Sequence, residues 1–209
     1  MRELLLTRQA RVDREAPCGD AVDLLASEQA EIAGEIQAPC GAEFHNGIAL
    51  TVVEPQSSGI GGGGYILHWD ASASTLTSID GRETAPAAAD ERLFLAADGK
   101  PLPFYEAVVG GRSVGVPGTL RMLEAAHRQH GKLPWAALFQ PAITLATNGF
   151  QVSPRLNTLL KAEQHLKKDP VAAAYFYQAN GEPHPVGHVL RNPELAAVLQ
   201  RVAAEGSRA

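Results

Sequence analysis

The feature that most constrains this chain is a run of glycines between a short polar turn and two strand-like stretches. Residues 54–86 read EPQSSGIGGGGYILHWDASASTLTSIDGRETAP, with glycine at position 59 and at positions 61–64. Each glycine costs roughly 0.5–1 kcal/mol relative to alanine, but it accepts positive φ and allows close approach of the backbone. The run therefore predicts tight turns, a close crossing of chain segments or a nest of backbone amides for an anion.

The residues that follow the glycines predict a hairpin that presents an arginine. Residues 65–69 and 75–79 have strand-like composition, and a polar turn joins them. Asp80 and Gly81 end the second stretch, and Arg82 comes next. A guanidinium group at such a turn can hold a carboxylate through two parallel hydrogen bonds. The alternative interpretation of Arg82 is a surface ion pair with Asp80 or Glu83.

The rest of the chain adds helices, so the predicted fold class is α+β in a single unit. Residues 47–53 are apolar and predict either the end of a buried helix or a strand. Residues 104–115 are expected to be irregular because glycines interrupt them. Helices are predicted, from caps and spacing of apolar residues, over 21–37, 91–95 (capped by Asp90), 119–130, 135–147, 155–168 and 193–205.

Composition excludes several classes of protein. Hydrophobic residues make up 45% of the 209 positions and charged residues 20%, which is typical of a globular domain. The net charge of −5 and the absence of a basic run argue against nucleic-acid binding. No apolar run approaches the ~20 residues that cross a bilayer, and none fits a signal peptide, so the sequence taken literally predicts a cytoplasmic protein without a membrane segment. Cys18 and Cys40 can pair or remain free.

Two glycine motifs suggest chemistry of their own. The spacing Gly59-x-Gly61-x-x-Gly64 matches a dinucleotide-binding pattern, which requires a helix directly after it, whereas a strand is predicted there. The segment GRSVG at 111–115 matches the nucleophile elbow of serine hydrolases, so Ser113 is an alternative nucleophile, with His184 or His188 and Asp169 as possible partners. That elbow requires a strand before it and a helix directly after it, and VPG intervenes at 116–118.

The histidines predict no metal site. The pairs at 127 and 130 and at 184 and 188 have helical spacing, but no H-E-x-x-H motif or mixed cysteine–histidine cluster accompanies them. We therefore expect no metal ligands and no cofactor, and we expect the histidines to pack or to face solvent.

Several long motifs, in order, resemble the large subunit of γ-glutamyltranspeptidase, also called glutathione hydrolase. They cover about residues 52–206. The motifs read EPQSSGIGGGGYILHWD, DGRETAPAAA, GGRSVGVPGT, HGKLPWAALFQPAI, NGFQVSPRL and VGHVLRNPELAAVLQRVAAEG.

The resemblance implies an N-terminal-nucleophile hydrolase with an αββα sandwich, of which this chain supplies large-subunit strands and a helical C-terminal portion. Family members cleave themselves into a large and a small subunit. The new N-terminal threonine of the small subunit attacks the γ-glutamyl amide of glutathione, and water or an amino acid or peptide accepts the γ-glutamyl group. The resemblance implies that Arg82 binds the α-carboxylate of the γ-glutamyl group. Family members are commonly periplasmic or secreted, which leaves the localisation open.

The same resemblance sets limits on the chain. The threonine and the small subunit are not found in residues 1–209, so no catalytic residue is assigned and the chain alone is expected to be inactive. Residues 1–47 are predicted to be an atypical segment, because the family's G-G-N-A-V-D-A-A helix has no match directly before residue 54, and residues 48–209 are predicted to be the family region. Two alternatives remain: a non-catalytic remnant that binds small amino acids through Arg82, and a serine hydrolase that uses Ser113.

Overall fold

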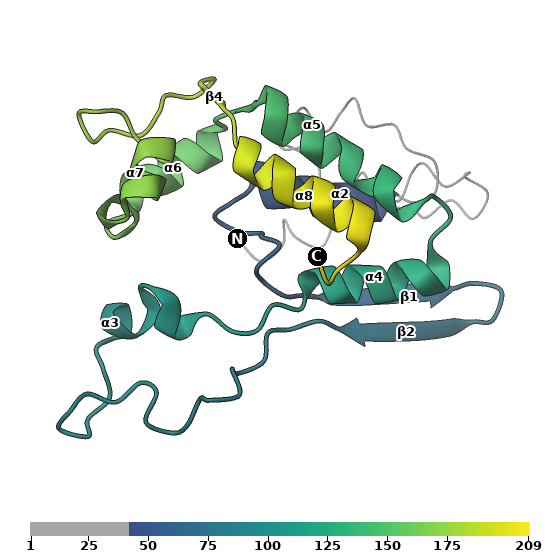
Figure 1. The fold of residues 1–209 in the computed structure, drawn as a ribbon, viewed down its shortest axis with the longest axis horizontal. Coiled ribbons are helices and arrows are strands. Elements are labelled where there is room, and N and C mark those ends of the chain that lie inside the picture. Colours follow the sequence, from purple (N-terminus) through teal and green to yellow (C-terminus); the bar gives the residue numbers. More distant parts are fainter. Residues whose placement is uncertain (1–41) are drawn as a thin grey trace, which may run out of the picture.

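The structure is a computed structural model that describes residues 42–209, shown in Figure 1. Helices and strands are mixed, which confirms the predicted α+β class. The α-helices are α2 (Ala42–Val53), α3 (Phe104–Val108), α4 (Thr119–His130), α5 (Gln140–Asn148), α6 (Pro154–Ala162), α7 (Pro170–Phe176) and α8 (Pro193–Glu205). The 3₁₀ helices are η2 (Gly111–Ser113), η3 (Trp135–Phe139) and η4 (Leu166–Lys168), and the strands are β1 (Tyr65–Asp70), β2 (Thr75–Asp80), β3 (Phe150–Gln151) and β4 (Val189–Leu190).

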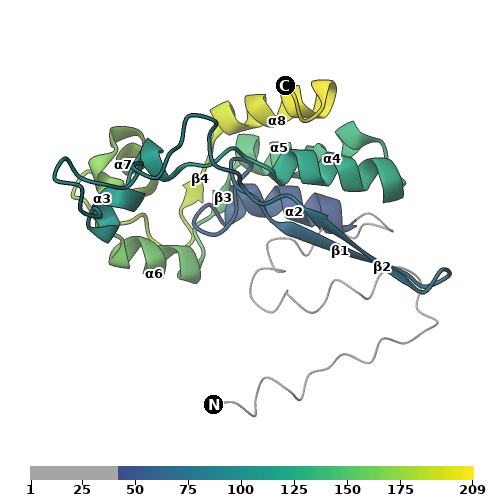
Figure 2. The same ribbon diagram turned by 90° about the horizontal axis from the view of Figure 1, so that it is seen from below.

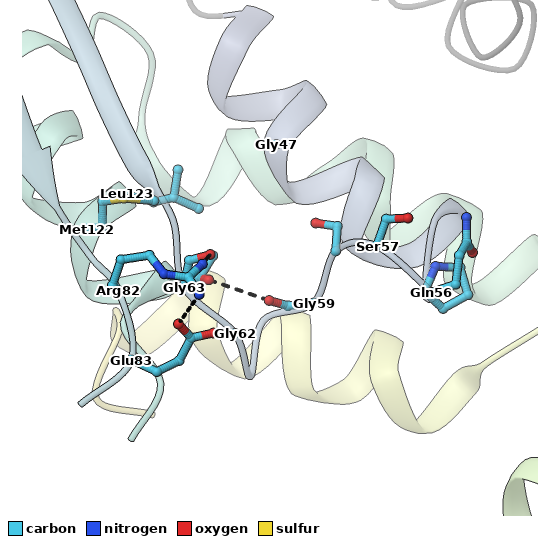
Figure 3. Close-up of a pocket in the computed structure, with 13 residues that line it drawn as sticks. Gly47, Gln56, Ser57, Gly59, Gly62, Gly63, Arg82, Glu83, Met122 and Leu123 are labelled. Atoms are coloured by element: carbon cyan, nitrogen blue, oxygen red, sulfur yellow. Dashed lines mark hydrogen bonds and ion pairs between the residues drawn. The ribbon is translucent and has the colours of Figure 1, made fainter. Parts of the chain in front are cut away.

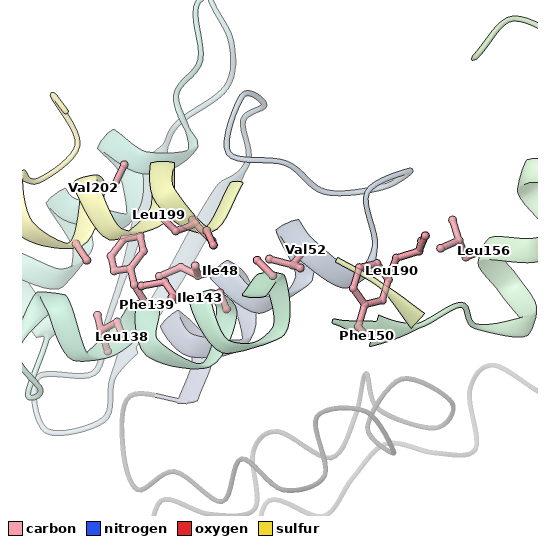
Figure 4. Close-up of a cluster of buried hydrophobic side chains, with 14 of the residues drawn as sticks. Ile48, Val52, Leu138, Phe139, Ile143, Phe150, Leu156, Leu190, Leu199 and Val202 are labelled. Atoms are coloured by element: carbon pink, nitrogen blue, oxygen red, sulfur yellow. The ribbon is translucent and has the colours of Figure 1, made fainter. Parts of the chain in front are cut away.

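The main core lies between α2, α5, α8 and η3 (Figure 4). Ile48, Phe139 and Leu199 are completely buried there. None of the α2 residues whose side chains the structure describes is exposed, as expected for a helix surrounded by protein. Residues 47–53, for which the sequence left helix and strand open, are the second half of this helix. The indole of Trp135 donates to the Val202 carbonyl at 3.0 Å, which ties η3 to α8.

Two helices begin at caps that the sequence predicted, Ser153 and Asn192, and a third begins at Asp169, which the sequence predicted only as the end of the preceding helix. The side chains of Ser153, Asp169 and Asn192 accept hydrogen bonds from backbone amides in the first turns of α6, α7 and α8, and a proline follows each cap. Each bond satisfies one of the amides that a helix start leaves without a partner. The predicted helix over 21–37 and both cysteines lie outside the described residues.

Two predictions about the connecting segments are wrong. Residues 91–95 form turns rather than a helix, because Leu95 pairs with Pro101 across the 96–100 turn and Asp90 accepts from the Arg92 amide. Residues 104–115 are not irregular throughout, since they contain α3 and η2.

Strands β1 and β2 form an antiparallel hairpin whose two faces differ. Tyr65 pairs with Asp80 and Trp69 pairs with Leu76, so their side chains share one face. On that face Tyr65, Leu67, Trp69 and Leu76 are 64%, 69%, 58% and 60% exposed. The opposite face carries Ile66, which packs against the core, and lies beside α4 (Figure 2). The hairpin is therefore covered on one side only within the described residues.

Neither a membrane-spanning helix nor a metal cluster is found in residues 42–209. None of their helices is both long and apolar enough to cross a bilayer. Within the same residues, no three side chains of histidine, cysteine, aspartate or glutamate gather where they could ligate a metal ion.

Candidate functional site

Three chain segments cross at the glycine run. The amides of Gly118 and Thr119 donate to the Gly62 carbonyl at 3.0 and 3.1 Å, which joins the start of α4 to the glycine loop. Gly64 and Gly81 exchange backbone hydrogen bonds of 3.2 and 3.0 Å, which continue the hairpin ladder into the same loop. Of the three possibilities that the glycines predicted, the close crossing is therefore present.

Glycine is required at the crossing because the backbones leave no room for a side chain. A Cβ atom on Gly118 would overlap the Gly81 carbonyl oxygen, and a Cβ atom on Gly63 would lie 2.5 Å from the same oxygen. Gly61, in the same loop, has no neighbour within 4 Å of its Cβ position. The sequence therefore contains glycines that the crossing requires and at least one that it does not.

Arg82 directly follows Gly81 at this crossing, and its half-exposed side chain contacts neighbouring residues of the same region. Its amide donates to Asp80 Oδ1 at 2.9 Å, and its Nη1 donates to the Gly63 carbonyl at 3.2 Å. Its Nη2 lies 3.0 Å from Glu83 Oε2, so the ion pair that the sequence offered as an alternative is present (Figure 3). These two side-chain contacts use only part of the five N–H donors of a guanidinium group, and 52% of the side chain remains exposed.

A pocket of about 470 Å³ lies beside Arg82. Figure 3 shows Arg82 and Glu83 on one side of it and the turn that contains Gln56 and Ser57 on the other. Its lining comes from α2, the turn after it, the glycine loop, the segment after β2 and the start of α4: Gly47, Pro55, Gln56, Ser57, Ser58, Gly59, Gly62, Gly63, Arg82, Glu83, Thr119, Met122 and Leu123. This volume lies in the range of small-molecule sites.

The turn after α2 is fixed by a buried carboxylate. Glu54 is 5% exposed, its side chain accepts from Gln56 Nε2, and its carbonyl accepts from the amides of Ser57 and Ser58 at 2.9 Å. Arg155 Nε lies 3.5 Å from Glu54 Oε2 and offsets its charge. Sequence reasoning missed Gln56, Ser57 and Ser58 as pocket residues. Their position between a buried helix and the glycine run is the signal that points to them.

Ser113 does not occupy a nucleophile elbow. It ends the 3₁₀ helix η2, and its hydroxyl donates to the Val108 carbonyl at 2.7 Å. Its proposed partners are engaged elsewhere: Asp169 caps α7, and His184 stacks on His188 with ring centroids 3.9 Å apart. Within residues 42–209 no hydrogen bond joins Ser113 to a histidine.

The remaining histidines pack against neighbours. His127 Nε2 lies 2.7 Å from the Leu133 carbonyl, and His68 stacks on His130 with centroids 3.7 Å apart, which links β1 to the end of α4. Burial, with the nearby His188 as a second cause, lowers the pKa of His184 below its ordinary value. These contacts agree with the packing roles that the sequence predicted.

Comparison with known proteins gives one consistent family. A model of the γ-glutamyltranspeptidase family matches residues 43–209. The glutathione hydrolase proenzyme of Bacillus subtilis is 40% identical over 161 residues, which cover 77% of this chain and 27% of that protein. The chain thus spans about 27% of the length of this curated relative.

Solved structures agree with that result. The Helicobacter pylori γ-glutamyltranspeptidase superposes with a TM-score of 0.75 at 32% identity, covering 80% of this chain and 48% of that one. The enzyme of Pseudomonas nitroreducens, solved with L-DON, superposes with a TM-score of 0.72, also at 32% identity, over 85% of this chain and 52% of that one. The likeness supports the predicted N-terminal-nucleophile hydrolase fold, of which residues 42–209 contain the β1–β2 hairpin and the helices. The predicted boundary between residues 47 and 48 stays a prediction.

Proposed function

Because the chain belongs to the γ-glutamyltranspeptidase family, we propose that it forms the part of a γ-glutamyltransferase and glutathione hydrolase that holds the γ-glutamyl group. Arg82 is proposed as the residue that binds the α-carboxylate of that group. The observation that carries this proposal is the placement of Arg82: a backbone crossing fixes it, and its guanidinium group borders a pocket of about 470 Å³.

The geometry around Arg82 suits a carboxylate ligand. The contact with Gly63 orients one edge of the guanidinium group, and the bond from the Arg82 amide to Asp80 fixes the backbone below it. Glu83 pairs with Arg82, and a substrate carboxylate replaces or shares that partner. The side chains of Arg82 and Glu83 are 52% and 28% exposed. Ion pairs that solvent reaches contribute only about 0–1 kcal/mol, so exchanging the partner costs little.

The proposed reaction is transfer of the γ-glutamyl group. An N-terminal threonine that residues 1–209 do not provide attacks the γ-carbonyl carbon, with its own amine as base. The C–N bond of the amide breaks, the amine leaves with a proton, and water or an amino acid or peptide amine then attacks the ester. The role of Arg82 in these steps is to orient the substrate, and this chain contributes no nucleophile.

The exposed face of the hairpin supports a further part of the proposal. Tyr65, Leu67, Trp69 and Leu76 place four large apolar side chains on one face of a sheet that has two strands within residues 42–209. Such a patch marks an interface in a soluble protein. We propose that the small subunit of the enzyme covers this face and that its strands complete the sandwich.

A chimeric enzyme tests the proposed function. Residues 43–209 replace the matching segment of the Bacillus subtilis proenzyme, and cleavage of glutathione is measured after self-processing. The chimera is expected to hydrolyse glutathione, and Arg82→Gln is expected to lower kcat/KM on the order of 100-fold, because a charge-assisted bidentate contact is lost.

Self-processing of the Arg82→Gln chimera reports that it folds, and Arg92→Gln, a nearby exposed arginine paired with Asp90, is the matched control. A processed chimera that leaves glutathione intact would favour the non-catalytic alternative. An Arg82→Gln variant with unchanged kcat/KM would contradict the role of Arg82.

A further inference from the structure

The Arg82–Glu83 pair also lines a second hollow. It has a volume of about 560 Å³ and is formed by the chain after β2 and by the segment that returns from η2 to α4. An antiparallel bridge between Thr84 and Val116 joins these two segments, with the Val116 amide donating to the Thr84 carbonyl at 2.8 Å. Arg82 and Glu83 line both hollows, so the two hollows adjoin at this pair.

Arg112 brings an unneutralised positive charge into this hollow. Its Nη1 donates to the Leu93 carbonyl at 3.2 Å, and no carboxylate of residues 42–209 pairs with it. Arg82 and Arg92, in contrast, lie 3.0 and 2.7 Å from the carboxylates of Glu83 and Asp90. A guanidinium group with one neutral acceptor keeps most of its five donors available.

The charges and the walls of the hollow define the class of ligand. Arg82 and Glu83 neutralise each other, so Arg112 leaves the lining with one net positive charge and favours an anion. Phe94, which is 42% exposed, and Leu93 provide an apolar wall beside it. Ser113 lines the same hollow, but its hydroxyl proton is already donated to Val108. A short molecule with one carboxylate and a small apolar portion fits this combination.

We propose that Arg112 binds the carboxylate on the amine side of the reaction, that of the departing or accepting amino acid or dipeptide. This inference rests on the proposed function, because it extends the Arg82 site to the other end of the substrate. A γ-glutamyl dipeptide carries a carboxylate at each end, and both guanidinium groups border one hollow. Arg112 is thus a specificity-determining residue that selects amines with a free carboxylate.

The test is saturation-transfer NMR on the 209-residue chain at low protein concentration, with three probes. Glycylglycine presents the carboxylate, glycylglycinamide lacks it, and L-glutamate reports on Arg82. Wild type is expected to bind glycylglycine about tenfold more tightly than its amide, the effect of one charge-assisted contact. Arg112→Gln is expected to abolish this preference and leave L-glutamate affinity unchanged, Arg112→Lys to retain part of it, and Arg92→Gln to change nothing.

The outcomes separate this inference from the proposed function. Arg82→Gln is expected to weaken the binding of L-glutamate and to leave the preference for glycylglycine over its amide unchanged. If wild type distinguishes the dipeptide from its amide but ignores L-glutamate, the Arg82 proposal fails and the Arg112 site stands. Equal affinity of wild type for the dipeptide and its amide, or an unchanged preference in Arg112→Gln, overturns the Arg112 site. Arg112 is exposed on a 3₁₀ turn, and circular dichroism confirms that the variants fold.

Discussion

The helical layer and the glycine-linked hairpin of this molecule are stabilised in different ways. In the layer of α2, α5, α8 and η3, side chains fill the space between elements, and Phe139 and Leu199 are completely buried. In the hairpin region, backbone hydrogen bonds among Gly62, Gly64, Gly81 and Gly118 hold the segments together. The difference separates two tasks: side-chain packing provides stability, and the backbone crossing positions Arg82.

The largest effect on the free energy of unfolding is expected from a substitution in the helical layer. Phe139→Ala removes a completely buried ring that packs on Trp135 with centroids 4.8 Å apart. It is expected to lower the free energy of unfolding by about 3–5 kcal/mol. Urea denaturation measures this loss, and Trp69→Ala on the exposed hairpin face is the control, expected to stay within about 0.5 kcal/mol of wild type. Equal losses in the two variants would remove the distinction between the regions.

A smaller effect is expected at the backbone crossing. Gly118→Ala places a methyl group against the Gly81 carbonyl and is expected to cost about 1–3 kcal/mol, because the segments must move apart. Arg82 follows Gly81, so L-glutamate binding is expected to weaken as well. Gly61→Ala is the matched control in the same loop, where the added methyl group meets no atom within 4 Å. Unfolding and ligand titrations of the pair measure both effects, and identical behaviour of the two variants would show that the crossing is loose.

The link between α4 and the chain after α8 is expected to depend weakly on pH. The Ser207 hydroxyl donates to Glu124, and this bond, followed by the charges of Arg128 and Arg121, outweighs burial and holds the pKa of Glu124 below its ordinary value. A carboxyl group with a lowered folded-state pKa stabilises the fold above its unfolded value, and this contribution disappears as pH falls through the folded value. Glu124→Gln is expected to cost less than about 1 kcal/mol at neutral pH.

That loss is expected to vanish in acid, since wild-type Glu124 is then also uncharged. Unfolding free energies of wild type and Glu124→Gln, measured from neutral pH to below the ordinary glutamate pKa, check this. A gap between the two proteins that stays constant over the whole range would contradict the lowered pKa.

The smallest effect on stability, with a clear effect on association, is expected at the exposed hairpin face. Leu67→Thr combined with Trp69→Thr keeps β-propensity and removes apolar surface. The free energy of unfolding is expected to stay unchanged, while self-association of the isolated chain falls. Gel filtration at several concentrations compares the two proteins, and a wild-type chain that elutes as a sharp monomer would argue against a covered interface on this face.

The structural features that could be predicted from the sequence were those determined by residues close together along the chain. The strand-like composition of 65–69 and 75–79 and the polar turn between them predicted the hairpin. Ser153 and Asn192 marked helix starts because a cap acts within three residues of itself. The glycines predicted a close crossing, but the partner at Gly118, more than fifty positions away, followed no local rule. Arg82 was therefore found from sequence, whereas the pocket beside it was not.

Helix interruptions were harder to predict for a related reason. The predicted helix over 135–147 is 3₁₀ up to Phe139 and α-helical from Gln140, and Pro141, which has no amide proton, lies at that change. The predicted helix over 155–168 stops at Ala162, because the Glu163 carboxylate accepts from the amides of His165 and Leu166. Such side-chain bonds compete with the helix ladder.

Binding of the α-carboxylate of a γ-glutamyl group by Arg82 can be tested by comparing two ligands. L-glutamate and its α-amide, isoglutamine, differ only at that carboxylate, and their affinities are measured for wild type and for Arg82→Gln. We predict that wild type prefers L-glutamate by about tenfold or more, the value of a charge-assisted contact, and that Arg82→Gln shows no preference. Equal affinity of wild type for both ligands, or the same preference in both proteins, would contradict the role of Arg82.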